Sequence, residues 1–197
     1  MIITNIDKYD GHLLHNRFAY QYFRDKTLPI GNIIAFRAPM HVEASGMIDH
    51  EDVLNDDFIY SDDAVNFLWE LPNVDFFGAV SFQRLFNSQL AAILSKKYLD
   101  GAPIEVDGDD LMVHKEHNQH GIIQPKGKCS VSITHLKDGA ALGHTAINVV
   151  AGKKAPAFAY STNLTDEQVN SFMRDTIDMF YGTTDDIFIA TTKIISK

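Results

Sequence analysis

Three short stretches in the second half of the chain decide the fold: GDDLMV at residues 108–113, GKCSVSI at residues 127–133 and GHTAINVV at residues 143–150. After Pro103 the apolar residues recur with a period of two, which is the spacing of side chains on one face of a β-strand. We therefore predict strands at residues 111–113, 130–134 and 146–150.

Helices are predicted in the first half of the chain, where apolar residues follow helical spacing after a typical capping residue. Asp10 is expected to cap a helix whose apolar residues recur at i, i+4, namely Leu14, Phe18 and Tyr22. Ser61 is expected to cap a second helix over residues 62–71. A long third helix is predicted to start at Asn73 or Asp75 and to reach residue 99.

The last part of the chain predicts one more helix and a final strand. Thr165 and Gln168 form a capping-box pattern, and Gly182 is expected to end the helix that they open. The final strand is predicted at residues 187–195. Two further strands are predicted in the first part of the chain, at residues 2–6 and at residues 33–37, where Pro39 is expected to end the strand. The resulting order indicates an α+β fold, in which a mixed, mostly antiparallel sheet is covered by helices.

Composition narrows the class of protein. The chain has 197 residues, which suits one domain over residues 1–197, and a net charge of −9, which argues against nucleic acid as a partner. Cys129 is the only cysteine, so a reducing, cytoplasmic location is expected. No apolar run approaches the roughly 20 residues that span a membrane, and we expect no signal peptide because residues 1–11 have neither a basic start nor an apolar run. A small-molecule ligand is the expected partner.

The three stretches resemble the catalytic core of the superfamily of biotin ligases, lipoate ligases and octanoyltransferases. These enzymes have an Asn-Asp-aliphatic strand, a strand that begins Gly-(Lys/Arg)-Lys and a His-Gly-x-(Ala/Leu)-Leu-Asn-Val strand, in that order. The chain also resembles a prokaryotic family known as domain of unknown function 366. That family shares the pattern MIDxEDxLxxDxIYS, here residues 47–61, together with GDDL and SVSI. The resemblance implies a class II synthetase-like core.

The resemblance also implies an activity, the activation or transfer of a small carboxylic acid, and assigns residues to it. Lys128 matches the lysine that stabilises charge beside the acyl carbonyl, Asp110 matches its orienting aspartate, and His144 matches the histidine of the third strand. ATP with Mg²⁺ is the cofactor that such chemistry implies. The expected substrate contacts are Arg37, Asp109, Asn148, Ser130 and Ser132.

Each of these residues also has a simpler interpretation. Lys128 can be a solvated surface charge, Asp109 and Asp110 can form a hairpin turn, and His144 can be a core histidine that bonds to backbone. Cys129 adjoins Lys128 on a strand, where neighbours point to opposite faces, so we expect it to pack in the core.

The largest departure from the ligases lies in the segment FRAPMHVEASGMIDHED, residues 36–52, where the ligases carry a glycine- and arginine-rich phosphate-binding loop. The segment is acidic, and it can bind a divalent metal through Asp49, Asp52 and Glu51, or it can be a solvated helix N-terminus. A second candidate metal group, in a loop where exposed polar residues are the default, comprises His114, His117 and His120.

Three functions therefore compete. The first is a ligase-like acyl or adenylyl transferase with Lys128 as electrostatic catalyst. The second is a non-catalytic binding protein that kept the ligase fold and lost the nucleotide loop. The third is a metal-dependent enzyme built on Asp49 and Asp52. A homodimer formed through the acidic helical region or the last strand is compatible with each of them.

Overall fold

The computed structural model describes residues 1–18, 20–23, 31–114 and 126–195. Its main feature is a five-stranded sheet in the order β1-β2-β3-β8-β7, in which only the β1–β2 pair is parallel. The strands are β1 (Ile2–Ile3), β2 (Asn32–Val42), β3 (Ile59–Pro72), β7 (Ser130–Lys137) and β8 (Ala140–Val150). A smaller antiparallel sheet comprises β4 (Ile104–Asp107), β5 (Asp110–His114) and β6 (Lys126–Lys128). The predicted mixed, mostly antiparallel sheet is confirmed.

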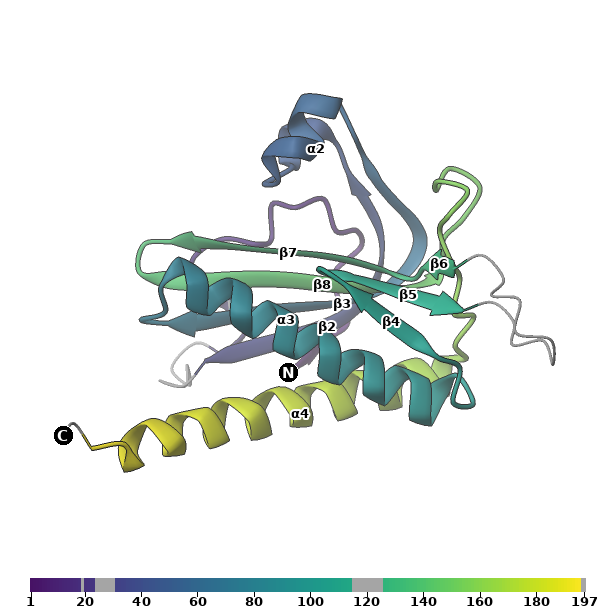
Figure 1. Ribbon diagram of the computed structural model, residues 1–197. Helices are drawn as coiled ribbons and strands as arrows, with labels where there is room; N and C mark the ends of the chain where they lie inside the picture. Colours follow the sequence, from purple (N-terminus) through teal and green to yellow (C-terminus); the bar gives the residue numbers. More distant parts are fainter. Residues whose placement is uncertain (19, 24–30, 115–125, 196–197) are drawn as a thin grey trace.

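Two long helices cover one face of the large sheet (Figure 1). α3 (Phe76–Ile93) begins at Asp75, whose carboxylate accepts from the Gly78 amide, and it ends in a π-helical turn, η2 (Leu94–Tyr98). α4 (Asp166–Lys193) begins with the predicted capping box of Thr165 and Gln168. The helices and the sheet enclose the larger core cluster, which is dominated by aromatic side chains: Phe67, Trp69, Phe82, Phe86, Phe172 and Phe180.

The opposite face of the sheet is covered by the N-terminal segment and by residues 43–58, which we call the acidic segment. α1 (Tyr20–Phe23) follows the N-terminal turns, while η1 (Ala44–Gly46) and α2 (His50–Asn55) lie between β2 and β3. Tyr9, Leu14 and Phe18 are buried against the apolar residues of β2, where they form a second core cluster. No residue of α2 is buried, so this helix stands away from both cores (Figure 1).

The helix predicted over residues 62–71 is wrong, because these residues form the central strand β3. Both faces of this strand are covered, and residues 64–71 are all buried. A strand covered on both faces has a continuous apolar run, and periodicity alone does not separate such a run from a buried helix. The Ser61 hydroxyl, predicted as a cap, donates instead to the carbonyl oxygens of Asp63 and Val150, both at 3.0 Å.

The helix predicted from Asp10 is also wrong. Gly11 and Arg17 have φ angles of 91° and 61°, so the chain turns twice within the span that the apolar spacing assigned to a helix. Asp10 instead accepts a hydrogen bond from the amide of His12 at 3.1 Å. β2 does not end at Pro39, because its pairing with β3 shifts register between Ala38 and Met40, and proline is tolerated at such an irregularity.

The C-terminal strand predicted at residues 187–195 is likewise replaced, because α4 continues through Gly182 to Lys193. A glycine inside a helix costs only about 1 kcal/mol relative to alanine, which the rest of a long helix offsets. Residues 187–195 pair with no strand of either sheet, and a helix satisfies its backbone hydrogen bonds internally.

Candidate functional site

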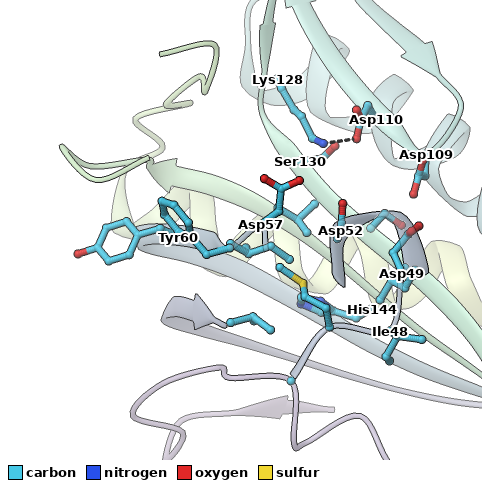
Figure 2. Close-up of a pocket in the computed structure, with 18 of the residues that line it drawn as sticks. Ile48, Asp49, Asp52, Asp57, Tyr60, Asp109, Asp110, Lys128, Ser130 and His144 are labelled. Carbon is cyan, nitrogen blue, oxygen red and sulfur yellow. Dashed lines mark ion pairs between the residues drawn. The ribbon is translucent and has the colours of Figure 1, made fainter. Parts of the chain in front are cut away.

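A cavity of about 730 Å³ opens between the large sheet and the acidic segment that contains α2 (Figure 2). Its floor comes from β7, β8 and the N-terminal segment, and its wall from residues 46–60, β5 and β6. Its polar and charged lining side chains include most of the predicted site residues: Asp49, Glu51, Asp52, Asp109, Asp110, Lys128, His144 and Asn148. The structure therefore brings together residues that lie far apart in the sequence.

Lys128 and Asp110 form an ion pair at the edge of this cavity, with 2.7 Å between Nζ and Oδ1 (Figure 2). Both side chains are about one-third exposed, at 29% and 32%. The backbone of Lys128 is held on its other side by residues 158–160, because its amide donates to the Phe158 carbonyl at 2.9 Å and its carbonyl accepts from the Tyr160 amide at 2.8 Å. The pairing expected of Asp110 and Lys128 is thus present.

The floor of the cavity contains a neutral histidine. Nε2 of His144 lies 3.0 Å from Oδ1 of Asn66, and its ring packs on Tyr9 with 4.0 Å between ring centroids. Burial lowers the pKa of His144 to about 3. The imidazole therefore stays uncharged at neutral pH, where it is a polar part of the floor.

Asn148 supplies an unpaired acceptor. Its side chain is 4% exposed, and among the described residues no donor reaches Oδ1. Asn148 follows Ala146 by two residues and His144 by four on β8, so the three side chains lie on the same face of the sheet. A buried acceptor without a partner is unfavourable in the absence of a ligand or of water.

The wall is acidic. Six carboxylates line the cavity, and Lys128 is the one lysine or arginine among the described lining residues. Burial raises the pKa of Asp52, and the nearby charges of Asp49 and Asp57 raise it further. Figure 2 shows the carboxyl groups of Asp52 and Asp57 directed into the space in front of Lys128.

The predicted metal ligands Asp49, Glu51 and Asp52 all line this wall. Asp49 caps α2, since its Oδ1 accepts from the Glu51 amide at 2.8 Å. Within the described part of the chain, no three His, Cys, Asp or Glu side chains are arranged to hold a metal ion. His114 lies near Glu105 of β4, with 3.6 Å between Nε2 and Oε2. His117 and His120 lie outside the described residues.

Arg37, predicted as a substrate contact, lies elsewhere. Its guanidinium binds Asp63 through Nε and Nη2 and also binds Asp166 at the start of α4, at 2.5 Å. These hydrogen bonds raise its pKa. It is absent from the cavity lining and instead joins β2 to β3 and α4. Arg37 is therefore a structural residue.

The hydroxyl groups of Ser130 and Ser132 are also used within the fold. Ser130 accepts from the Leu111 amide at 2.8 Å, and Ser132 contacts the amide of Gln83 and the hydroxyl of Thr145, both at 2.9 Å. Ser130 therefore joins β7 to β5, and Ser132 joins β7 to α3 and β8. The same network continues through Asn87, whose Nδ2 donates to the Asp109 carbonyl at 2.9 Å. It fixes the turn that carries Asp109 and Asp110.

Sequence reasoning missed several lining residues. Asp57 could have been predicted from the sequence, because Asp57 is the last aspartate of the pattern MIDxEDxLxxDxIYS. Tyr60 also belongs to this pattern, whereas Tyr9, Phe58 and Phe158 carried no signal, since each lies outside the fixed positions of any recognised motif. Cys129 behaves as predicted, because it is fully buried and burial raises the pKa of its thiol to about 12.

A family model described as "Domain of unknown function (DUF366)" matches residues 1–195. The chain belongs to this family. No curated protein matches this DUF366 chain. Among the described helices, none has the length and apolarity that crossing a membrane requires.

Solved structures show what the DUF366 fold is similar to. A protein of unknown function from Pyrococcus horikoshi has a TM-score of 0.82 at 23% identity, covering 100% of this chain and 97% of its own. P. falciparum LipL1 in complex with lipoate has a TM-score of 0.52 at 14% identity, covering 92% of this chain and 60% of its own. A mutant biotin protein ligase from Aquifex aeolicus in complex with biotin has a TM-score of 0.52 at 12% identity, covering 90% and 68%. The predicted biotin/lipoate ligase-like fold is confirmed.

Proposed function

We propose that this protein transfers the acyl group of a small carboxylic acid derivative, with Lys128 as the electrostatic catalyst. The observation that carries the proposal is the Lys128–Asp110 ion pair, at 2.7 Å, on the edge of a cavity of about 730 Å³. A cavity of this size suits a small molecule. Two structures of similar fold hold lipoate and biotin, which are both small carboxylic acids.

Lys128 suits this role because its charge is fixed in position. Attack on an acyl carbonyl places negative charge on the carbonyl oxygen, and a pre-positioned cation stabilises that charge. Asp110 restrains the ammonium group, and the hydrogen bonds of the Lys128 backbone restrain the strand that carries it. Asp110 is thus a positioning residue. Neutral His144 contributes shape and polarity to the floor, and the proposal assigns it no proton transfer.

The cavity does not fit a nucleotide triphosphate. Its carboxylates repel a polyanion, and its one lysine is already paired with Asp110. A triphosphate bridged by Mg²⁺ would need carboxylates gathered around one ion, and the described residues offer no such group of three. The proposal therefore starts from an acyl group that is already activated, and no step passes through ATP.

The transfer can be followed with acyl thioesters of N-acetylcysteamine and hydroxylamine as acceptor. The acyl carbon forms a bond to the hydroxylamine nitrogen and loses its bond to sulfur, and the nitrogen proton ends on the thiol. Hydroxamate and free thiol are therefore released in equal amounts. We expect turnover for at least one chain length between acetyl and octanoyl.

Lys128→Met is expected to lower this turnover by about 100-fold, the usual effect of removing one group that stabilises an oxyanion. Lys126→Met is the matched control, because Lys126 lies on the same strand, pairs with Glu105 and does not line the cavity. The absence of hydroxamate from every thioester, or equal turnover by Lys128→Met and the wild type, would refute the proposal. Hydroxamate from free acids only with ATP and Mg²⁺ would indicate adenylation instead.

A second candidate is a binding protein without turnover. The acidic wall does not fit a nucleotide, which a ligase needs in order to adenylate its substrate. This mismatch favours a binding protein. Native mass spectrometry of the purified protein separates the two functions. A small molecule that stays bound, with no acyl transfer under any condition, supports the binding protein, whereas hydroxamate formation excludes it.

A further inference from the structure

The acidic wall of the cavity is built from three aspartates on one side, Asp49, Asp52 and Asp57, facing Lys128 on the other. We propose that this wall binds a positively charged nitrogen of the ligand, an ammonium or guanidinium group, so that the substrate is an amino- or guanidino-substituted carboxylic acid. The carboxyl group of this ligand rests on the proposed function. Its charged nitrogen is inferred from the charge of the lining, from the unpaired acceptor of Asn148 and from the aromatic side chains of the cavity.

The first observation is uncompensated charge. Six carboxylates line the cavity against one described lysine, Lys128, which pairs with Asp110 and also lowers the pKa of Asp52, so the described lining keeps an excess of negative charge. Burial raises the pKa of Asp52, and the charges of Asp49 and Asp57 raise it further, so the Asp52 carboxylate is repelled by both neighbours. A cation placed among them removes that repulsion. A ligand without positive charge leaves it in place.

The second observation is the unpaired acceptor on Asn148. Its Oδ1 is buried, shares the cavity face with His144 and meets no donor from the described residues. The group that satisfies it must therefore donate a hydrogen bond. Ammonium and guanidinium groups are multiple donors, and a hydrocarbon chain is none. This acceptor lies on β8, so it is independent of the acidic segment.

The third observation concerns the kind of cation. Aromatic side chains lie beside the carboxylates in the lining, and Phe58 and Phe158 are both more than half exposed. The ring of Tyr60 already receives a cation, since Nζ of Lys154 lies 5.4 Å from its centroid. Aromatic faces attract organic ammonium and guanidinium groups. Bare divalent ions instead require oxygen ligands gathered at one point. The wall thus favours an organic cation.

Equilibrium binding tests this inference without any need for turnover. Calorimetric titration with ε-aminocaproate and with caproate compares two acids of equal chain length that differ by one ammonium group. We expect ε-aminocaproate, or one of L-lysine and L-arginine, to bind at least about tenfold more tightly than caproate, the effect of one charged hydrogen bond.

Variants locate the effect. Asp57→Asn and Asp52→Asn are expected to weaken binding of the preferred cationic acid by about tenfold and to leave caproate unchanged. Asp56→Asn is the matched control, because Asp56 is adjacent, carries the same charge and does not line this cavity. Its left-handed φ of 55° is also compatible with asparagine. Asn148→Leu is expected to weaken binding of the same acid, with folding checked by circular dichroism.

The inference fails if caproate binds as tightly as the cationic acids, if none of the three cationic acids binds, or if Asp57→Asn and Asp56→Asn behave alike. It also fails if Mg²⁺ alone binds stoichiometrically, depends on Asp52, and excludes ε-aminocaproate. The result is separable from the proposed function. Selective binding of a cationic acid without hydroxamate formation removes only the acyl transfer, whereas turnover of an unsubstituted thioester with no preference for cations removes only this inference.

Discussion

Nε2 of His144 and Oδ1 of Asn66 are 3.0 Å apart, and both residues are buried in the sheet. Asn66 also donates from Nδ2 to the carbonyl oxygens of Ala38 and Ala64, so its carboxamide joins three strands. The orientation of the amide is therefore fixed, and its oxygen faces the ring. The pair accordingly requires the histidine to donate from Nε2.

This arrangement predicts a pH-dependent stability. The pKa of His144 is about 3 in the folded protein and 6.5 in a model compound, so below pH 6.5 the unfolded chain binds a proton that the folded protein does not. Stability is thus complete above pH 6.5 and falls on acidification. Between pH 7 and pH 5 this one group contributes a loss of about 2 kcal/mol.

Chemical denaturation at several pH values measures that loss. The free energy of unfolding of His144→Gln is expected to fall less than that of the wild type between neutral and mildly acidic pH. His12→Gln is the control, because His12 is exposed, and it should follow the wild type. Parallel curves for His144→Gln and the wild type would contradict the assignment.

Asp52→Asn is expected to stabilise the ligand-free protein at neutral pH. The pKa of Asp52 is raised by burial and by the charges of Asp49 and Asp57. The unfavourable effect therefore appears as pH rises through the folded pKa and is absent when the carboxyl is protonated. We expect a gain below about 1 kcal/mol, because the site is partly solvated. Thermal melting at neutral and acidic pH measures it, and a gain that persists at acidic pH would contradict repulsion as the cause.

Gly143→Ala is expected to destabilise the fold strongly. A Cβ atom at this position would lie 2.0 Å from ring atoms of Trp69, a fully buried side chain in the central strand. Overpacking of this kind costs about 1–3 kcal/mol and more where the neighbour has no room to move. Gly182→Ala is the matched control, since its Cβ meets nothing within 4 Å in the middle of α4. It is expected to stabilise by about 1 kcal/mol, and equal melting temperatures for both variants would contradict the packing argument.

Cys129 is expected to resist thiol reagents in the folded protein. Its side chain is fully buried and its pKa is raised to about 12 by burial, so almost no thiolate is present at pH 8. Reaction with Ellman's reagent should therefore be slow in buffer and immediate in guanidinium chloride. Rapid labelling of the native protein would show that the strand junction at Cys129 opens.

Much of the fold followed from local signals in the sequence. The cap of α4 was predicted at Thr165, and Asp75 was one of the two residues predicted to start α3, because both side chains act on backbone groups within three residues. The strands at residues 111–113, 130–134 and 146–150 were predicted from their pattern. The pairing of Lys128 with Asp110 was implied by the resemblance to the ligases, whose strand motifs occur in the same order along the chain.

The failures have equally physical causes. β3 was mistaken for a helix because its identity depends on being covered on both faces, which is a property of the assembled sheet. The role of Arg37 depends on Asp166, which lies 129 residues away. The cavity wall depends on how the acidic segment folds back over β7 and β8, so the sequence indicated Asp49, Glu51 and Asp52 as candidate ligands but not the side of the cavity that they share with Lys128.

The groups proposed to bind the ligand belong to different sheets. Lys128 is the last residue of β6 in the small sheet, whereas His144 and Asn148 lie on β8 of the large one. The two sheets meet where the Cys129 amide donates to the Leu111 carbonyl at 2.9 Å and the Asn148 amide donates to the Cys129 carbonyl at 2.8 Å. Leu111 and Cys129 both belong to the larger core cluster, so the packing of that core fixes the distance between the ammonium group of Lys128 and the carboxamide of Asn148. The length of molecule that the proposed site accepts is therefore set by the core rather than by mobile side chains.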